Sequence, residues 1–280
     1  MCSNHSTPEK LVDLARRMRI NIIRLAYSVG NKGAHIGSAL SCTDIFAVLY
    51  GNVLNYNVLQ PMWTQRDRFL LGKGHGALAL YAALHEVGFI SKTELYQYQE
   101  NGGAFPGQPV MNSKYGIEVS SGSLGHMLSV GEGIALSAKS LGADYNTYVL
   151  LGDGECNEGT IWESAMSSAH FKLDNLVTIV DVNGMQSDGI SHAILDMGNL
   201  PEKWGAFGWD VLEVNGHDVI ELDSAFHSIE HNGKPTVILA HTIKGKGISF
   251  MENDNTWHHN HLSKEQYLLA LSELGGDTDA

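Results

Sequence analysis

The sequence has few cysteines, few prolines and no long apolar run. Its three cysteines, Cys2, Cys42 and Cys156, form no C-x-x-C pair, so we expect reduced thiols and neither a zinc knuckle nor a disulfide framework. No repeat or Pro-rich linker divides the 280 residues. No window approaches the roughly 18 consecutive apolar residues of a membrane span, and the first residues lack the layout of a signal peptide. We therefore expect a cytoplasmic protein with no membrane partner.

Basic residues are also scarce. The chain has 18 Lys and Arg against 31 Asp and Glu, which gives a formal net charge of −13. Because nucleic-acid binding needs clustered basic side chains to neutralise phosphates, a nucleic-acid partner is not expected. The hydrophobic content of 43% and the charged content of 18% are typical of a globular protein with a large core.

Apolar patterns predict helices that alternate with buried strands. The helices are expected at residues 9–29, 43–54 with Thr43 as N-cap, 74–88, 157–173 and about 263–274. The strands are expected at residues 147–151, 176–182, 209–214 and 236–242. A strand, a helix and a strand of these lengths form a crossover unit. We therefore expect the α/β class, with a mainly parallel sheet flanked by helices on both faces.

An acidic glycine loop follows the first buried run. Residues 150–159 read LLGDGECNEG, which fails the spacing of dinucleotide sites and lacks the G-K-[ST] of a P-loop. A carboxylate beside a phosphate is repulsive unless a divalent cation lies between them, and Mg²⁺ accepts carboxylate, amide and carbonyl oxygens. Asp153 would therefore share a cation with Asn183, 183 − 153 = 30 positions downstream. The alternative is a tight turn in which Asp153 caps the next helix.

Seven ordered blocks that cover nearly the whole chain resemble the amino-terminal half of transketolases. The blocks are GAHIGSALSCTDIFAVLY, RDRFLLGKGHGALALYAAL, GIEVSSGSLGHMLSVGEGIALSAK, GDGECNEGTIWES, DVNGMQSDG, GWDVLEVNGHD and HTIKGKGISFMENDNTWHH. The resemblance implies a transferase that moves a two-carbon ketol unit from a ketose donor to an acceptor. It also implies that residues 1–280 form a single thiamine diphosphate-binding domain, called the PP domain, with a helical amino-terminal segment at about 9–30.

The resemblance also assigns the cofactor and metal ligands. Asp153, the Asn183 side chain and the Met185 carbonyl would hold Mg²⁺, for which Ca²⁺ or Mn²⁺ could substitute. Ile190 and neighbouring apolar residues would serve for packing. The other residues expected to contact thiamine diphosphate are His75, Gly122, Leu124, Gly152, Gly154, Glu155 and His258.

Three of the 14 histidines match family positions, namely His35, His75 and His258. An imidazole with a pKa near neutrality can move protons to substrate hydroxyls or stabilise an oxyanion. We expect all three to be catalytic, with His35 and His258 also contacting the substrate. The run HHNH at 258–261 has no carboxylate or cysteine companions at ligand spacing, so zinc is not expected there.

The glutamate that activates the cofactor in transketolases lies on a pyrimidine-binding domain that no block of this chain matches. The resemblance therefore implies a split enzyme that works only with a separate carboxyl-terminal subunit, in an α2β2 complex. Helices at 74–87 and 125–138 would be buried against partner chains. Glu158 matches an interface glutamate that couples two active sites, and its plainer interpretation is a first-turn helix carboxylate.

One block departs from the family pattern. FPGQP at 105–109 has Gln108 where transketolases carry a histidine that contacts the donor sugar. Gln forms hydrogen bonds but cannot be charged, so ordinary sugar-phosphate turnover is in doubt unless the change is neutral.

Two other functions stay open. One is delivery of the two-carbon unit to a lipoyl or thiol arm of a carrier protein, as in 2-oxo acid dehydrogenases, and the other is cofactor binding without catalysis.

Overall fold

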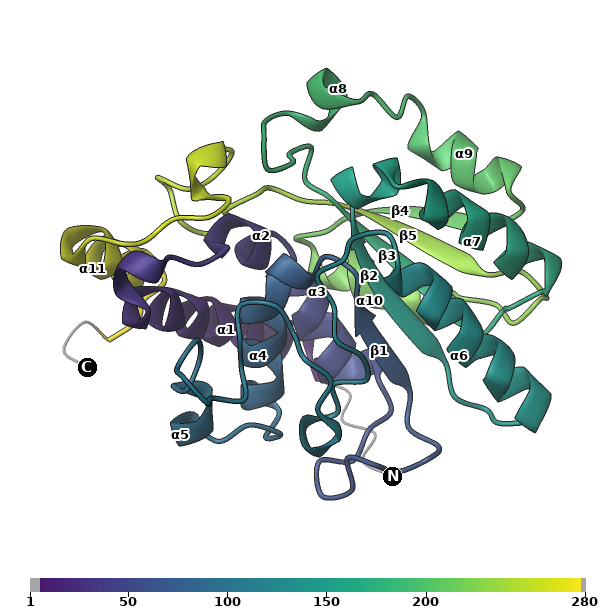
Figure 1. Ribbon diagram of the computed structural model, residues 1–280, viewed down its shortest axis with the longest axis horizontal. Helices are drawn as coiled ribbons and strands as arrows, with labels where there is room; N and C mark the ends of the chain where they lie inside the picture. Colours follow the sequence, from purple (N-terminus) through teal and green to yellow (C-terminus); the bar gives the residue numbers. More distant parts are fainter. Residues whose placement is uncertain (1–5, 278–280) are drawn as a thin grey trace.

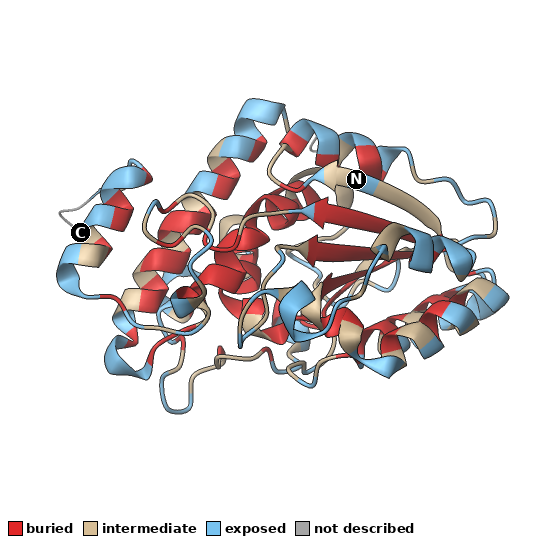
Figure 2. Ribbon diagram, turned by 90° about the horizontal axis from the view of Figure 1, so that it is seen from above, coloured by how far each residue is buried: buried red, intermediate tan, exposed pale blue. Residues whose placement is uncertain are grey.

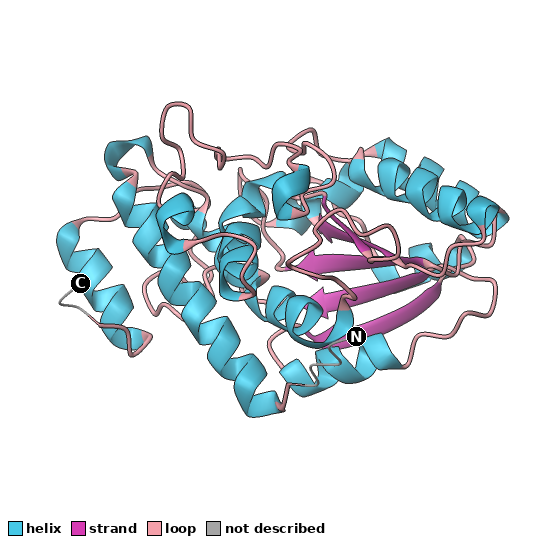
Figure 3. Ribbon diagram, turned by 90° about the horizontal axis from the view of Figure 1, so that it is seen from below, coloured by secondary structure: helices cyan, strands magenta, loops and turns pink. Residues whose placement is uncertain are grey.

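Five parallel strands form one sheet in the part of the chain that the structure describes. The computed structural model describes residues 6–277, so Cys2 lies outside the described residues. The strand order is β1-β2-β3-β5-β4, and every neighbouring pair is parallel. Figure 3 shows the strands side by side with helices around them. The strands are β1 (Arg68–Leu71), β2 (Thr147–Gly152), β3 (Leu176–Val182), β4 (Asp210–Asn215) and β5 (Thr236–His241).

Helices of varied length connect and cover the strands. The α-helices are α1 (Pro8–Ser28), α2 (Ile36–Ser41), α3 (Thr43–Val48), α4 (Ala77–Glu86), α5 (Lys92–Leu95), α6 (Met127–Leu141), α7 (Gly159–His170), α8 (Ser191–Ile194), α9 (Leu200–Ala206), α10 (Val219–His227) and α11 (Lys264–Glu273). The shorter turns are η1 (Gly30–Lys32), the π-helix η2 (Leu49–Val53), η3 (Gly74–Gly76), η4 (Ser113–Tyr115), η5 (Gly154–Asn157) and η6 (Asn255–Trp257). Between residues 6 and 277, no helix is both long and apolar enough to cross a bilayer.

The two faces of the sheet bury different hydrophobic clusters. Leu150 and Ile179 point to the face covered by α1, α3, α4 and α10, whereas Val149 and Val180 point to the face covered by α6, α7 and α9. This alternation follows from the two-residue period of a strand. Figure 1 shows α6 and α7 on one side of the sheet and α1 and α4 on the other, and Figure 2 shows the strands buried between helices. The expected fold class is confirmed.

Most of the predicted elements are present. Helix α1 corresponds to the predicted amino-terminal helix, α11 to the final helix, and β2 to β5 to the four predicted strands. Strand β1 has no counterpart in the prediction. Its sequence, RFLL, is four residues long and begins with the charged Arg68, which is too short to show a period of alternation.

Two predictions about the helices are wrong. Thr43 does not cap a helix, because it is the first residue of α3 with Cys42 at the cap position, and its hydroxyl donates to the Ala39 carbonyl at 2.9 Å. The apolar surface of α4 was expected to be buried against a partner chain, but residues 77–84 are all buried within this chain. Helices α1, α2 and α3 cover it.

The strand register brings the loops of the site to one edge of the sheet. Leu71 of β1 pairs with Leu150 of β2, and Gly152 at the end of β2 pairs with Asp181 of β3. Strands β3 and β5 also end together. The loops after β1, β2, β3 and β5 therefore start side by side at the carboxyl edge, where open parallel sheets bind their ligands.

Candidate active site

Asp153 directly follows β2 and joins two strand-end loops. Its Oδ1 accepts from the Gly154 N–H at 2.8 Å, and its Oδ2 accepts from the Gly184 N–H and the Ser191 hydroxyl, both at 2.9 Å. The capping interpretation describes only part of this role, because Asp153 precedes the short helix η5 and also reaches the loop after β3. Burial raises the pKa of Asp153, and the Asp181 carboxylate adds to the rise. A cation beside this carboxylate would offset that cost.

The loop after β3, which the Gly184 N–H joins to Asp153, carries the Asn183 amide and the Met185 carbonyl. Asn183 Nδ2 donates to Asp181 at 3.2 Å, and Asn183 Oδ1 accepts from the Met185 N–H at 3.0 Å. One carboxylate, one amide oxygen and one carbonyl oxygen make an oxygen-only donor set, which suits Mg²⁺. Among the described residues no three His, Cys, Asp or Glu side chains are grouped to hold a metal. An ion here would therefore depend on the Asn183 and Met185 oxygens.

Two glycines expected at the cofactor occupy positions that a larger residue would not fit. Gly122 has a φ of +124°, and this conformation favours glycine. At Gly154, an added Cβ would lie 2.6 Å from Cγ of Gln186. Gly152 is buried at the end of β2, and Leu124 is half-buried in the same loop as Gly122. The four residues line the turn after β2 and the loop before α6.

Glu155 ties these two segments together. Its side chain is 3% exposed, and its oxygens accept from the Gly125 N–H at 2.9 Å and the Gly152 N–H at 3.1 Å. Burial raises the pKa of Glu155 to about 7. Because each carboxylate oxygen is bonded to a backbone amide, the geometry favours a positioning role for Glu155 over a direct cofactor contact.

The three histidines predicted to be catalytic lie together. Their ring centroids are 5.6 Å apart for His35 and His75, 5.4 Å for His35 and His258, and 5.2 Å for His75 and His258. Their segments precede α2, follow β1 and follow η6. A fourth ring, His259, lies 4.6 Å from His35. Sequence reasoning missed His259, although it adjoins His258 in the NTWHH block.

Burial keeps these rings uncharged at neutral pH. It lowers the pKa of His35 to about 4 and that of His258 to about 3, and it holds the pKa of His75 well below its ordinary value. The Lys244 ammonium adds to the effect at His258, and that of Lys73 adds to the effect at His75. The expected near-neutral pKa values are therefore wrong. A neutral imidazole can donate a hydrogen bond through one ring nitrogen and accept one through the other.

A buried ion pair that sequence reasoning missed lies beneath the site. Lys73 is 1% exposed and forms a salt bridge with Asp181, which is 0% exposed. Lys73 also donates to the Ser38 carbonyl at 3.0 Å, and Asp181 accepts from the hydroxyls of Ser41, at 2.6 Å, and Thr242. Burial alone would lower the pKa of Lys73, but the Asp181 carboxylate outweighs it and the pKa is raised. The only sequence signal is GKG and DVN, 108 positions apart from Lys to Asp.

Lys244, which follows β5, is the second buried lysine of the site and was also missed. It is 1% exposed. Its Nζ lies 2.8 Å from His258 Nδ1, 3.0 Å from the Gln186 carbonyl oxygen and 2.7 Å from Asn255 Oδ1. Burial lowers the pKa of Lys244 to about 8, and the charge of Lys73 contributes to the fall. The KGKG motif in the sequence was the available signal.

Gln108 lies against the segment that carries His75. A Cβ atom at Gly74 would be 2.5 Å from Gln108 Oε1 and 2.8 Å from Ser121 Oγ. Both oxygens are buried and have no hydrogen-bond partner among the described residues. Buried polar atoms are nearly always hydrogen-bonded. The amide of Gln108 therefore presents an unsatisfied acceptor beside Gly74, the residue before His75.

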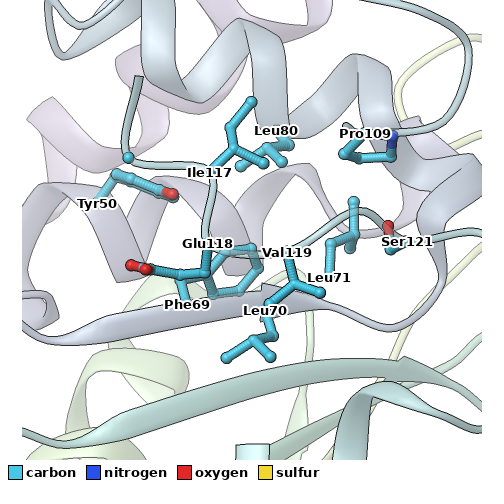
Figure 4. A pocket seen from close by; sticks show the side chains of 11 residues that line it. Tyr50, Phe69, Leu70, Leu71, Leu80, Pro109, Ile117, Glu118, Val119 and Ser121 are labelled. Atoms are coloured by element: carbon cyan, nitrogen blue, oxygen red, sulfur yellow. The ribbon is translucent and has the colours of Figure 1, made fainter. Parts of the chain in front are cut away.

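A small pocket close to this segment is a packing gap. Figure 4 shows its apolar walls, which include Phe69 of β1, Leu80 of α4 and Ile117. Its volume is about 10 Å³, at the lower limit for a single water molecule. It is too small for a cofactor or a sugar.

Glu158 and Ile190 both lie at the surface. Glu158 occupies the cap position of α7 and is exposed. A Cβ added at Gly125 would lie 2.6 Å from the Cβ of Glu158. Ile190 is 49% exposed, and its neighbours Ile194 and Leu195 are 44% and 56% exposed. Ile190 was expected to serve for packing, but about half of its side chain is exposed in this chain, so that expectation is wrong.

Residues 9–280 match the family described as "Transketolase, thiamine diphosphate binding domain". The chain belongs to the transketolase family. This transketolase-family chain is 42% identical over 261 residues to a protein of Phocaeicola vulgatus named as one subunit of an apulose-4-phosphate transketolase, covering 93% of this chain and 92% of that protein. It is 37% identical over 270 residues to "6-deoxy-6-sulfo-D-fructose transketolase subunit SqwG" of Clostridium sp., covering 95% and 98%.

A solved transketolase has the same fold. The transketolase from Leishmania mexicana superposes on this transketolase-family chain with a TM-score of 0.89 at 28% identity, covering 98% of this chain and 42% of its own. The chain thus spans less than half of that solved relative. The expected transferase class and the thiamine diphosphate-binding domain are confirmed. The relatives support ketol transfer and lend no support to the carrier-arm or non-catalytic alternatives.

Proposed function

We propose that this chain is the cofactor-binding subunit of a two-chain transketolase that moves a two-carbon ketol unit from a ketose donor to an acceptor. The main support for this proposal is that His35, His75 and His258 lie together, with ring centroids no more than 5.6 Å apart. They lie at the edge of the sheet where the strand-end loops carry Asp153 and Asn183. We treat residues 1–280 as one domain and expect the complex in the cytoplasm.

Thiamine diphosphate and a divalent cation fit these strand ends. Asp153, the Asn183 amide oxygen and the Met185 carbonyl would hold Mg²⁺, or Ca²⁺ or Mn²⁺ in its place. When bound, the cofactor supplies the electron sink that lets a ketose C–C bond break. Gly152 and Gly154 would approach the diphosphate with their backbone. Gly122 and Leu124, in the loop anchored by Glu155, would contact the ring side of the cofactor.

The neutral histidines would act on the oxygens of the substrate. A ring N–H can donate to an oxygen on which negative charge develops, and an unprotonated ring nitrogen can accept from a hydroxyl. Both ring nitrogens of His35 and His75, and Nε2 of His258, have no hydrogen-bond partner among the described residues. These atoms are therefore available to a ligand.

Gln108 is proposed to select the donor. Its unpartnered buried oxygen would accept a hydrogen bond from a hydroxyl of the sugar beside His75. We expect Gln108→His to change kcat/KM for the preferred donor by about tenfold or more, since an unmatched buried polar group costs about 1–3 kcal/mol. The affinity for thiamine diphosphate, measured by titration, serves as the control and is expected to stay unchanged. An unaltered donor preference would show that the site tolerates either residue.

A separate subunit is proposed to supply the pyrimidine-binding domain and the activating glutamate, in an α2β2 assembly. The two relatives described above are named as transketolase subunits and are close to this chain in extent. Helix α6 has an exposed face of small residues, Ser129, Gly133 and Ser137, which permits close approach of another helix, and the exposed Glu158 lies at the start of neighbouring α7. We assign Glu158 to this interface.

Reconstitution tests the proposed function. The chain is mixed with its partner subunit, thiamine diphosphate, Mg²⁺ and a ketose phosphate donor, and the aldehyde product is measured with and without an acceptor aldose. We expect turnover by the pair and none by either chain alone. Loading of a carrier thiol in place of aldose extension would contradict ketol transfer, and so would tight cofactor binding without turnover.

A further inference from the structure

The ammonium of Lys244 is enclosed by three acceptors that carry no charge. The acceptors are the Gln186 carbonyl at 3.0 Å, Asn255 Oδ1 at 2.7 Å and His258 Nδ1 at 2.8 Å. A protonated lysine has three N–H donors and no acceptor. A pKa of about 8 leaves Lys244 mostly protonated at neutral pH. Each donor therefore has one acceptor, and the contact with His258 has a defined direction.

The orientation of Asn255 supports this direction. Asn255 Nδ2 donates to the Ser187 carbonyl at 2.8 Å, so its NH₂ group faces Ser187 and its oxygen faces Lys244. The amide cannot turn its NH₂ toward the ammonium without losing both bonds. Lys244 is thus a donor to every group around it, including the imidazole.

The backbone on both sides of Lys244 is held in place. The Ile243 N–H donates to His217 Nε2 at 2.8 Å, and the Gly245 N–H donates to the Gly37 carbonyl at 3.1 Å. Gly245 has a φ of +82°, and a Cβ there would lie 2.2 Å from a backbone oxygen of the neighbouring segment. Only glycine fits at this position. The backbone from which the Lys244 side chain extends is therefore held in one place.

We propose that Lys244 is a positioning residue that holds His258 in the tautomer with its proton on Nε2. A neutral imidazole carries one N–H, and the nitrogen that accepts from Lys244 must be the unprotonated one. The remaining nitrogen, Nε2, then carries the proton and has no partner among the described residues. His258 is left as a hydrogen-bond donor within the cluster formed with His35 and His75.

The catalytic consequence rests on the proposed function. In ketol transfer, a substrate oxygen gains or loses negative charge as the C–C bond breaks or forms. A fixed Nε2–H stabilises that charge without reorganising at the moment of reaction. Without Lys244, the ring of His258 would exchange between its two tautomers, and only part of the population would present the donor.

The tautomer is measured directly by NMR on the full chain labelled with ¹⁵N-histidine. Protonated and unprotonated ring nitrogens resonate far apart, and the His258 signals are assigned by their loss in His258→Gln. We expect wild-type His258 to show an unprotonated Nδ1 and a protonated Nε2 at pH 7. A proton on Nδ1, or an even mixture of the two tautomers, overturns the proposal.

Variants show whether Lys244 is the cause. Lys244→Met should convert the His258 signals to averaged tautomers, and Lys244→Arg, which retains a donor, should keep more of the Nε2–H form. The matched control is Lys246→Met, two residues along the same loop, where the side chain pairs with Glu252 at 3.3 Å at the surface. Unchanged His258 signals in folded Lys244→Met would overturn the proposal. If that variant does not fold, the wild-type spectrum still decides.

The NMR result does not depend on the proposed function. An Nε2–H tautomer without ketol transfer in the reconstituted pair would remove the proposed function and leave the positioning role. Ketol transfer with the proton on Nδ1 would do the reverse.

Discussion

Two buried lysines at the same end of the sheet have opposite electrostatic character. Lys73 and Lys244 are each 1% exposed. Lys73 faces the carboxylate of Asp181 and its pKa is raised, whereas the ammonium of Lys244 contacts only uncharged acceptors and its pKa is lowered to about 8. Burial lowers the pKa of both ammonium groups, but only Lys73 has a carboxylate partner that reverses the shift.

The two lysines have different roles. Lys73 supports the sheet, whereas Lys244 acts at the site. Lys73 and Asp181 bond to each other and to surrounding groups such as Ser41, which ties β1 and β3 to α2. Lys244 instead directs one of its donors to His258, a member of the histidine cluster. We therefore expect substitutions in the Lys73–Asp181 ion pair to lower stability, and substitutions of Lys244 to act mainly on catalysis.

The largest expected effect comes from breaking the ion pair. Asp181→Ala leaves the Lys73 ammonium buried without a counter-ion, which typically costs about 3–5 kcal/mol of unfolding free energy. Urea unfolding followed by circular dichroism measures the loss. The matched control is Asp188→Ala at an exposed position, where we expect a change within about 0.5 kcal/mol. Equal losses in the two variants would contradict the comparison.

Replacing both partners of the ion pair sharpens the same point. The double variant Lys73→Met with Asp181→Leu removes both charges together, and such replacements are often neutral or stabilising. We expect the double variant to be more stable than Asp181→Ala, and its loss to be smaller than the sum of the two single losses. Additive losses would show that the two side chains do not depend on each other.

A smaller stability effect is expected at the second lysine. Lys244→Met deprives three acceptors of their donors, at a cost of about 1–3 kcal/mol, but it also removes a buried charge that lacks a counter-ion. The net loss should therefore fall below that of Asp181→Ala in the same urea experiment. In the reconstituted pair, kcat should fall more than KM rises, and Lys246→Met should leave both near the wild-type values. A purely structural Lys244 would lower the amount of folded enzyme and leave kcat per active site unchanged.

The smallest effect is a difference in pH dependence. The folded pKa of Lys244 is about 8, below the ordinary 10.5, so between these values the unfolded chain binds more protons and the contribution of Lys244 to stability rises with pH. The raised pKa of Lys73 has the opposite sign: its contribution is present below 10.5 and is lost only as pH rises through the folded value. Wild type should gain stability relative to Lys244→Met from pH 7 to about pH 10. A flat or falling difference would contradict the assignment.

Sequence patterns were sufficient for the parts of the fold with strong local signals. Strands β2, β3 and β5 are apolar runs buried on both faces, and α1 has a clear helical period. Asp153 and Asn183 could be paired because one crossover unit separates them. Strand β1 was missed because four residues starting at Arg68 show no period, and Thr43 was misplaced because α2 and α3 follow each other with only Cys42 between them.

The second layer of the site depends on contacts that no local pattern reveals. Lys73 and Asp181 lie 108 positions apart, and lysine is usually exposed. The motif GKG therefore does not indicate a buried ion pair. The pKa values of the histidines followed from burial, which composition does not report. Ile190 was expected to pack, yet its exposure depends on the course of the loop after β3. Family resemblance located His35, His75 and His258, but not the lysine that contacts His258.

We propose that a divalent cation joins Asp153 and Asn183 to thiamine diphosphate. A calorimetric titration of thiamine diphosphate into the chain and its partner subunit, with and without Mg²⁺, tests it directly. We predict binding that requires Mg²⁺ and that weakens more than about 100-fold in Asp153→Ala, because even outer-shell partners of a metal contribute 10–100-fold. Asp188→Ala should bind as wild type does. Unchanged affinity in Asp153→Ala, or equally tight binding without any divalent cation, would show that no cation joins Asp153 to the cofactor.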